Sequence, residues 1–403
     1  MTETKAALDG YRILDMTTVV LGPYATQILG DLGAEVIKIE SPDGDVVRRT
    51  GFGPEAQFGT IYMALNRNKR SISLDLKQED AATVMEALLG WADVFVHNVR
   101  PKAMSRLGYT YDFARKINPQ IIYANAVGFG SDGPYSGVPA YDDTVQSVSG
   151  AASLMTYSDG DPQPRNIPTL IADKATGLHL TYSILAALLY RERTGEGQQI
   201  EVPMFESTVS FLLPEHIAGA IWNPPRGPMA YPRTSHPYNR PLKTRDGYLA
   251  FMPYIDQHWK DMLRIGERLD MLEDPRMESI ATRRMNMTEL GAILEEITQK
   301  FTTSEWCELL IKHDIPFMHV HDLDSLLTDE HLQEVGFFED YEHPPTGATY
   351  RAVQHPVHFS GTPATIRSHP PALGQDGREI LADVGMAAPE VERLIEKGVL
   401  LGV

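Results

Sequence analysis

Alternating strand-like and helix-like segments in the first third of the chain constrain the fold more than any other feature. Residues 11–16 and 34–40 predict strands, and residues 23–32 between them predict a helix with proline in its first turn. The alternation continues with predicted strands at 71–76, 93–98 and 121–127 and predicted helices at 79–91 and 111–117. Strands separated by single helices form parallel sheets. The sequence therefore predicts a doubly wound α/β fold in this region.

The composition changes after residue 207, where a second module is predicted. Residues 222–245 are rich in proline, which indicates a crossing between domains. A short strand at 248–254 and helices near 258–269, 290–300 and 304–313 follow, and two further helices are expected at 378–384 and 389–396.

Asp173 precedes a predicted helix at residues 174–190. No proline interrupts that stretch, and its apolar side chains recur at spacings of three and four. The simplest role for the aspartate is an N-cap, worth about 1 kcal/mol. The alternative is a nucleophile, because hydrogen bonds and the positive helix end would keep the carboxylate ionised at neutral pH, ready to attack an acyl carbon. Gly177, one turn later, leaves room for a ligand or another backbone.

The glycine fingerprint of dinucleotide-binding folds is missing from the first turn. Residues 17–23 read TTVVLGP, although Glu40 ends the second predicted strand as in such folds. GFGSDG at 128–133 matches the fingerprint but runs into Pro134, so it cannot open a helix. This argues against a dinucleotide-dependent oxidoreductase. We interpret the segment as a wide loop that brings Tyr141 and Asp142 toward Asp173.

Charge and composition exclude several classes of function. The net charge of -18 argues against a non-specific nucleic-acid binder. The single cysteine, Cys307, cannot form an internal disulfide, and thiolate metal sites are excluded by the same count. No apolar run approaches the length of a membrane span, and the first residues lack the pattern of a secretory signal. We therefore predict a cytoplasmic protein that binds neither membranes nor nucleic acid.

Two polar clusters have competing interpretations. His319 and His321 form an HxH pattern that could bind a metal, but no third ligand is evident nearby, so a structural role is favoured and no metal is predicted. Basic residues at 66–70 and at 100–106 lie near predicted strand ends. They could contact phosphates, as at the ligand-binding edge of open α/β sheets, or be solvated loop charges.

Nine segments, taken in order, resemble the family III CoA-transferases, the group of the formyl-CoA and carnitine CoA-transferases. No single segment is specific, but the ordered set covers the chain from about residue 8 to its end. The segments are LDGYRILDMT, GAEVIKIESPDGD, NRNKRSISLDLK, ADVFVHNVRP, GFGSDGPYSGVPAYD, IADKATG, RTGEGQQIEVPMFES, TRDGYL and PALGQDGREIL.

This resemblance implies a fold, an assembly and an activity. The implied fold is α/β, with a Rossmann-like large domain at residues 1–215 and 330–403 and a smaller α/β domain at 225–325. Two chains are expected to thread through each other as an interlocked homodimer. The expected substrates are an acyl-CoA and a small carboxylic acid, with no tightly bound cofactor besides coenzyme A as substrate.

The catalytic aspartate of this family falls on Asp173. The resemblance implies that its carboxylate attacks the acyl-CoA thioester to give a mixed anhydride. CoA thiolate then returns to form an aspartyl-CoA thioester, and the acceptor acid runs the same steps in reverse. By motif alignment, the CoA contacts would fall on Val19, Val20, Leu74, Lys77, Asn98, Val99, Arg106 and Tyr141.

Departures from the family pattern bear on the substrate and the reaction. Val20 stands where the formyl enzyme has glutamine, and NPPRG at 223–227 replaces its glycine-rich lid, so a carboxylate larger than formate or oxalate is expected. The α-methylacyl-CoA racemases of the same superfamily use a histidine where this chain has Ala140, and racemisation needs a second base opposite Asp173. A racemase remains the alternative, and a non-catalytic acyl-CoA-binding protein is a further one.

Three arginines lie in the predicted crossing between domains. The hypothesis is that the guanidinium group of one of them, Arg226, Arg233 or Arg240, binds a second carboxylate of the acceptor through two hydrogen bonds. Surface charges without a ligand are the competing interpretation.

Overall fold

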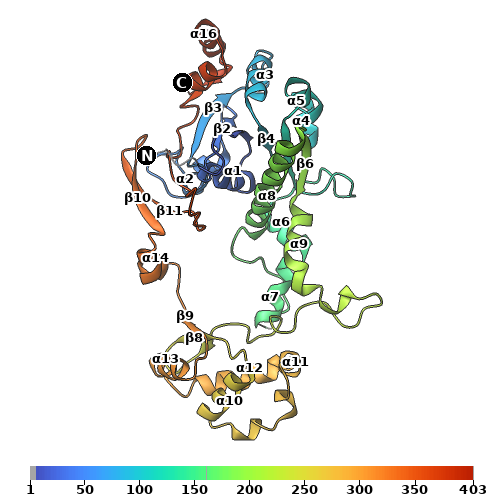
Figure 1. The fold of residues 1–403 in the computed structure, drawn as a ribbon, viewed down its shortest axis with the longest axis vertical. Coiled ribbons are helices and arrows are strands. Elements are labelled where there is room, and N and C mark those ends of the chain that lie inside the picture. Colours follow the sequence, from blue (N-terminus) through green and yellow to red (C-terminus); the bar gives the residue numbers. More distant parts are fainter. Residues whose placement is uncertain (1–5, 160, 403) are drawn as a thin grey trace. The chain divides into compact units, whose positions relative to one another are not determined.

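The computed structural model describes residues 6–159 and 161–402 and forms two compact units (Figure 1). Unit 1 consists of the described residues within Met1–Val145, Leu170–Thr208 and Glu330–Val403. Unit 2 consists of those within Gln146–Thr169 and Val209–Asp329. Each unit is described by itself.

A seven-stranded sheet organises unit 1. Its strands are β1 (Arg12–Met16), β2 (Glu35–Glu40), β3 (Lys69–Leu74), β4 (Val94–His97), β5 (Ile122–Val127), β6 (Gln198–Pro203) and β12 (Leu400–Leu401), in the order β12-β3-β2-β1-β4-β5-β6. All neighbours pair in parallel except β12, which is antiparallel to β3. From β1 the chain adds β2 and then β3 on one side of that strand, and it then crosses over to add β4 on the other side of β1. Open α/β sheets bind ligands at the carboxyl edge of such a reversal point.

Helices cover both faces of this sheet. The helices of unit 1 are α1 (Leu21–Asp31), α2 (Thr60–Leu65), α3 (Ala81–Trp91), α4 (Pro101–Leu107), α5 (Tyr111–Ile117), α8 (Ile171–Thr194), α14 (Glu330–Glu334), α15 (Gly377–Asp383), α16 (Ala388–Glu396) and the 3-10 turn at Val46–Arg49. Successive strand residues point to opposite faces. Ile13 packs in one core with side chains of α1 and α8, and Leu14 in the other with side chains of α3, α15 and α16. The predicted α/β class with a parallel sheet is therefore confirmed.

Three further features complete unit 1. The antiparallel hairpin of β10 (Phe338–His343) and β11 (Ala348–Val353) forms a separate two-stranded sheet. Helices α6 (Asp142–Ser149) and α9 (Met204–His216) begin in unit 1 and continue into unit 2. The GFGSDG segment at 128–133 lies in a loop and opens no helix, as its proline neighbour predicts.

Unit 2 is a smaller α/β body. Its strands β7 (Leu242–Lys243), β8 (Tyr248–Phe251) and β9 (Phe317–His319) form an antiparallel sheet, and its helices are α7 (Ala151–Asp159), α10 (Asp256–Ile265), α11 (Ile280–Met285), α12 (Met287–Thr298) and α13 (Thr303–Lys312), with 3-10 turns at Ala218–Ile221, Leu269–Met271, Pro275–Met277 and Ser325–Thr328. Trp306 is fully buried in its core, and the indole N–H donates to the carbonyl oxygen of Thr298 at 2.8 Å. A capping box between Thr302 and Glu305 starts α13 and fixes that helix beside the core.

The helices were also compared with the length and apolarity that a lipid bilayer requires. Within residues 6–159 and 161–402, none is long and apolar enough to cross a membrane.

Candidate active site

Asp173 lies in the first turn of α8 and is only 8% exposed. The helix begins at Ile171, three residues before the predicted start, and its N-cap is Leu170, which makes no side-chain capping bond. Asp173 is therefore the third residue of the helix, and the N-cap interpretation is wrong. Its backbone N–H donates to Oδ1 of Asp142 at 3.0 Å, so the segment after β5 does bring Asp142, the first residue of α6, to Asp173.

The charge state of Asp173 differs from the expectation. Burial, followed by the charges of Asp142 and Asp143, raises the pKa of Asp173 to about 7. The prediction that hydrogen bonds and the helix end keep this carboxylate ionised at neutral pH is wrong, because a helix end contributes only about 0.3–1 kcal/mol and burial costs more. A carboxyl that titrates near neutral pH in a buried position is typical of active sites.

Gly177 brings the start of α1 against α8. A Cβ atom at this glycine would lie 2.8 Å from the carbonyl oxygen of Leu21 and 3.0 Å from Cδ1 of Tyr24. The space that the glycine leaves is therefore filled by another backbone, one of the two possibilities that we expected. Residues four apart lie on the same helix face, so Asp173 faces the same side of α8 as this contact.

The turn between β1 and α1 is held in a rare conformation. Val19 has a φ of 72°, in the left-handed region that β-branched residues seldom adopt. Its N–H donates to both oxygens of Asp45, at 3.1 and 3.2 Å. Asn98, just after β4, accepts from the N–H of Thr18 at 3.0 Å and donates to its carbonyl oxygen at 2.9 Å. The turn is thus fixed at the reversal point of the sheet, and enforced strain of this kind clusters at binding sites.

A buried cluster of charges lies beneath this turn. Nζ of Lys38 donates to the carbonyl oxygen of Thr17 at 2.7 Å and to Asp45 at 3.2 Å. Nζ of Lys69 lies 3.1 Å from the carboxylate of Asp15, whose side chain is fully buried. Although burial alone would raise the pKa of Asp15, the charges of Lys69 and Lys38 lower it to about 2. The cluster keeps the turn in place through charges that are all paired.

The phosphate-contact interpretation is wrong for two of the basic residues at the start of β3. Lys69 pairs with Asp15, and Arg67 pairs with Asp31 at 2.7 Å. Both cations are buried, so neither is a solvated loop charge. Arg100 and Arg106, after β4, are exposed.

Most residues predicted to contact CoA lie at or just after the carboxyl ends of β1, β3 and β4. They are Val19, Val20, Leu74, Lys77, Asn98 and Val99. Because these strands are parallel, the ends share one edge of the sheet. The side chain of Leu74 is fully buried, whereas Lys77 is exposed. Among the described residues, no hydrogen bond or ion pair joins Asp173 to Arg106 on α4 or to Tyr141, which is 65% exposed.

The three arginines of the predicted crossing have different surroundings. The guanidinium of Arg226 lies over the ring of Trp222 at 4.7 Å. Arg240 pairs with Glu295 at 3.2 Å. Arg233 lines a pocket of unit 2.

The HxH pair has protein partners of its own. His321 contacts the hydroxyl of Ser325 at 3.2 Å and the carboxylate of Asp329 at 3.3 Å. In the part of the chain that the structure describes, no group of three or more His, Cys, Asp and Glu residues is arranged to hold a metal ion.

A titrating buried carboxyl and a fixed turn at the ligand-binding edge of a doubly wound sheet define an α/β enzyme. Residues 8–377 match the family model described as CoA-transferase family III. The chain belongs to this family and is a CoA-transferase, of the enzyme class EC 2.8.3.

Relatives and a solved structure match almost the whole chain. The probable fatty acyl-CoA transferase Rv3272 of Mycobacterium tuberculosis is 32% identical over 93% of this chain and 97% of its own length. The human succinyl-CoA:glutarate CoA-transferase is 31% identical over 94% of this chain and 86% of its own. The crystal structure of an aspartate-to-alanine mutant of Rv3272 superposes with a TM-score of 0.81 and 31% identity, covering 94% of this chain and 100% of that one.

Proposed function

We propose that this enzyme moves coenzyme A from an acyl-CoA donor to a carboxylic acid acceptor through covalent intermediates on Asp173. The observation that carries the proposal is the buried carboxyl in the first turn of α8, with its pKa raised to about 7. Such a group is ionised in about half of the molecules at pH 7, and burial strips its carboxylate of water. Both properties suit a nucleophile that must react with a thioester.

Each step exchanges one acyl bond for another. An oxygen of the Asp173 carboxylate attacks the thioester carbon, the C–S bond breaks, and CoA leaves as the thiolate while a mixed anhydride forms. The thiolate then attacks the aspartyl carbon of the anhydride, which releases the donor acid and leaves an aspartyl-CoA thioester. The acceptor carboxylate repeats these steps in reverse. Thioester and anhydride are both activated acyl groups, so no ATP is needed, but water must be excluded.

We propose that coenzyme A lies along the carboxyl edge of the Rossmann-like sheet of unit 1. The strained turn at Val19 and Val20 supports this position. Two hydrogen bonds between Asn98 and the backbone of Thr18 fix that turn, and a fixed turn at the reversal point presents backbone groups to a ligand. The other proposed contacts are Leu74, Lys77, Val99, Arg106 and Tyr141. The full burial of the Leu74 side chain limits its contact to the backbone.

The acceptor is proposed to be a carboxylic acid larger than formate or oxalate. The apolar Val20 in the turn supports this, since it replaces the glutamine that the formyl enzyme has there. The proposed assembly is an interlocked homodimer, with a large domain at 1–215 and 330–403 and a small domain at 225–325.

Mass spectrometry tests the function directly. The purified protein is incubated with succinyl-CoA or acetyl-CoA and a mixture of free carboxylic acids, and new acyl-CoA species are sought. We expect a new thioester with the native chain and with Asp132→Asn, a matched change in an exposed loop, and none with Asp173→Ala or Asp173→Asn. Full transfer by the Asp173 variants would contradict the proposal.

Racemisation of an acyl-CoA is the alternative function. A carboxyl with a pKa of about 7 also suits proton abstraction, and the carboxylate of Asp142 contacts the backbone of Asp173. Ala140 cannot act as the second base. Incubation of a 2-methylacyl-CoA in deuterated water tests this alternative: exchange of the α-proton without a carboxylic acid acceptor supports racemisation, and absence of exchange contradicts it.

A further inference from the structure

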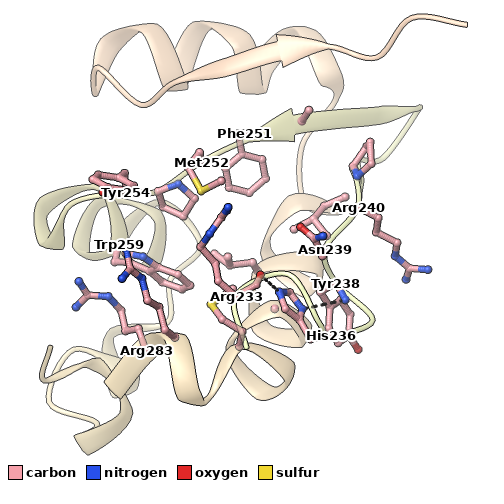
Figure 2. A pocket seen from close by; sticks show the side chains of 18 of the residues that line it. Arg233, His236, Tyr238, Asn239, Arg240, Phe251, Met252, Tyr254, Trp259 and Arg283 are labelled. Carbon is pink, nitrogen blue, oxygen red and sulfur yellow. Dashed lines mark hydrogen bonds between the residues drawn. The ribbon is translucent and has the colours of Figure 1, made fainter. Parts of the chain in front are cut away.

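We propose that unit 2 carries a binding pocket for a small organic acid, formed without any residue of unit 1. The pocket has a volume of about 360 Å³ and opens between β8, the loop before β7, and helices α11 and α12 (Figure 2). Ligand pockets have volumes of about 300 to 1,000 Å³, so this one suits a small ligand.

The charges that line the pocket all have one sign. Four arginines contribute to its wall, namely Arg233, Arg240, Arg283 and Arg284, and no aspartate or glutamate does. This cluster of positively charged side chains contrasts with the net charge of the whole chain, which is -18. A pocket of this kind attracts an anion and repels a cation.

Two of these arginines have an acidic partner, and two lack one among the residues that the structure describes. Arg240 pairs with Glu295, and Arg283 pairs with Asp256. No ion pair is formed there by Arg233 or Arg284, although both side chains are half-buried. In Figure 2, Arg233 lies between Trp259 and His236, whereas Arg240 points away from the pocket. A half-buried guanidinium without a counter-charge is poised to bind a carboxylate through two parallel hydrogen bonds.

Arg283 adds an unsatisfied donor to the same wall. The residue is 3% exposed, and Nη1 donates to the carbonyl oxygen of Met277 at 2.9 Å. Its Nε is buried and has no hydrogen-bond partner in the described part of the chain. Buried donors are nearly always paired, so a ligand that offers an acceptor to this Nε would satisfy a group that the protein atoms leave unpaired.

The loop that presents Arg233 is fixed by a buried histidine. His236 is 4% exposed, its Nε2 lies 2.8 Å from the carbonyl oxygen of Arg233, and its Nδ1 accepts from the N–H of Tyr238 at 3.2 Å. Tyr238 in turn touches α12, because a Cβ at Gly291 would lie 2.5 Å from the Cβ of Tyr238. Arg233 is therefore held on a rigid support, which reduces the entropy lost on binding.

The rest of the wall is apolar and defines the body of the ligand. The buried side chains of Leu242, Trp259 and Leu294 line the pocket, and Met252 and Ile280 are partly exposed to solvent. An inorganic anion would leave this apolar surface uncovered. The combination of apolar walls and free guanidinium groups therefore points to a carboxylate with an aliphatic or aromatic body.

Calorimetric titration of hexanoate into the full-length Asp173→Asn protein without coenzyme A tests this inference independently of transferase activity. We expect hexanoate to bind, and 1-hexanol, its uncharged counterpart, to bind at least tenfold more weakly. Arg233→Met keeps the apolar stem but removes the charge, and it should lower the affinity for hexanoate at least tenfold. Arg226→Met is the matched control, since that arginine lies over Trp222 outside the pocket lining, and it should leave hexanoate binding unchanged.

Three results would overturn the inference. They are equal binding of hexanoate and 1-hexanol, unchanged hexanoate binding by both Arg233→Met and Arg284→Met, and complete competition by an equimolar amount of inorganic phosphate. Arg284→Met serves as the second variant if Arg233→Met fails to fold, as judged by circular dichroism. Failure of these titrations would leave the proposed transfer chemistry at Asp173 untouched, because no coenzyme A takes part.

Discussion

Asp173 can act as a nucleophile only when its carboxyl is ionised. With its pKa raised to about 7, kcat/KM for the acyl-CoA donor should fall about tenfold per pH unit below 7 and level off above it. Asp142→Asn removes a like charge, so it should lower the pKa of Asp173 and move the midpoint down by roughly one pH unit. Initial rates between pH 5.5 and 8.5 measure both profiles. A flat profile, or a midpoint that Asp142→Asn leaves in place, would contradict this role.

The same carboxyl should make the folded protein less stable at high pH. The folded-state pKa of about 7 lies above the ordinary value of 3.8, so the folded protein binds a proton more readily than the unfolded chain between these values. Stability therefore rises as the pH falls through 7, and the ionised carboxylate costs stability above it. At pH 8, Asp173→Asn should raise the free energy of unfolding by on the order of 2–4 kcal/mol. Urea titrations should show that this gain in the free energy of unfolding shrinks toward pH 4. An equal gain at pH 8 and pH 4 would contradict the raised pKa of Asp173.

At the scale of elements, the close contact between α1 and α8 depends on the absence of a side chain at Gly177. Gly177→Ala would place a Cβ 2.8 Å from a backbone oxygen that cannot move aside easily, so we expect a loss of about 1–3 kcal/mol. Gly90→Ala in α3 is the matched control. Its Cβ would meet only Ile117 at 3.8 Å, and alanine favours a helix by up to about 1 kcal/mol. Chemical denaturation should therefore show opposite signs for the two variants, and the same sign would refute the explanation.

Elements with local patterns were predictable from the sequence, and those made by distant contacts were not. The strands β1 to β5 lie within about two or three residues of their predicted positions because apolar runs and turn residues mark them locally. The hairpin β10–β11 was missed because its strands are largely exposed and carry several charges, and β12 has only two residues. Helix α9 was missed because Pro214 lies inside it.

The features of the candidate site also fall into those that the sequence predicts and those that depend on distant contacts. Asp173 could be proposed from the sequence because its segment resembles a family motif, whereas its raised pKa depends on burial in the folded protein and then on Asp142 and Asp143, about thirty residues away. The buried charges beneath the turn at Val19 come together only through strand register, which pairs Asp15 with Lys38 across β1 and β2. No local signal in the sequence marks that pairing.

For the whole molecule, the proposed interlocked homodimer predicts both a mass and a rate. Two chains of 44.9 kDa should elute together as a species of about 90 kDa in light-scattering chromatography. Because threaded chains cannot separate without unfolding, tagged and untagged dimers that are mixed after purification should not exchange subunits over hours, whereas co-expression should yield mixed dimers. A single-chain mass, or exchange within minutes, would refute the interlocked arrangement.

The order of the segments in unit 1 has a consequence for synthesis on the ribosome. Residues 209–329 of unit 2 are continuous, but unit 1 is completed only by segments beyond residue 330. Side chains of α15 and α16 cover one face of the sheet, and β12 pairs with β3 at its edge. A nascent chain that has emerged as far as residue 329 therefore lacks the part of this apolar cover that α15 and α16 supply and leaves the edge of β3 unpaired, and both features favour aggregation. We therefore expect the incomplete chain to need protection from aggregation until residues 330–403 have been synthesised.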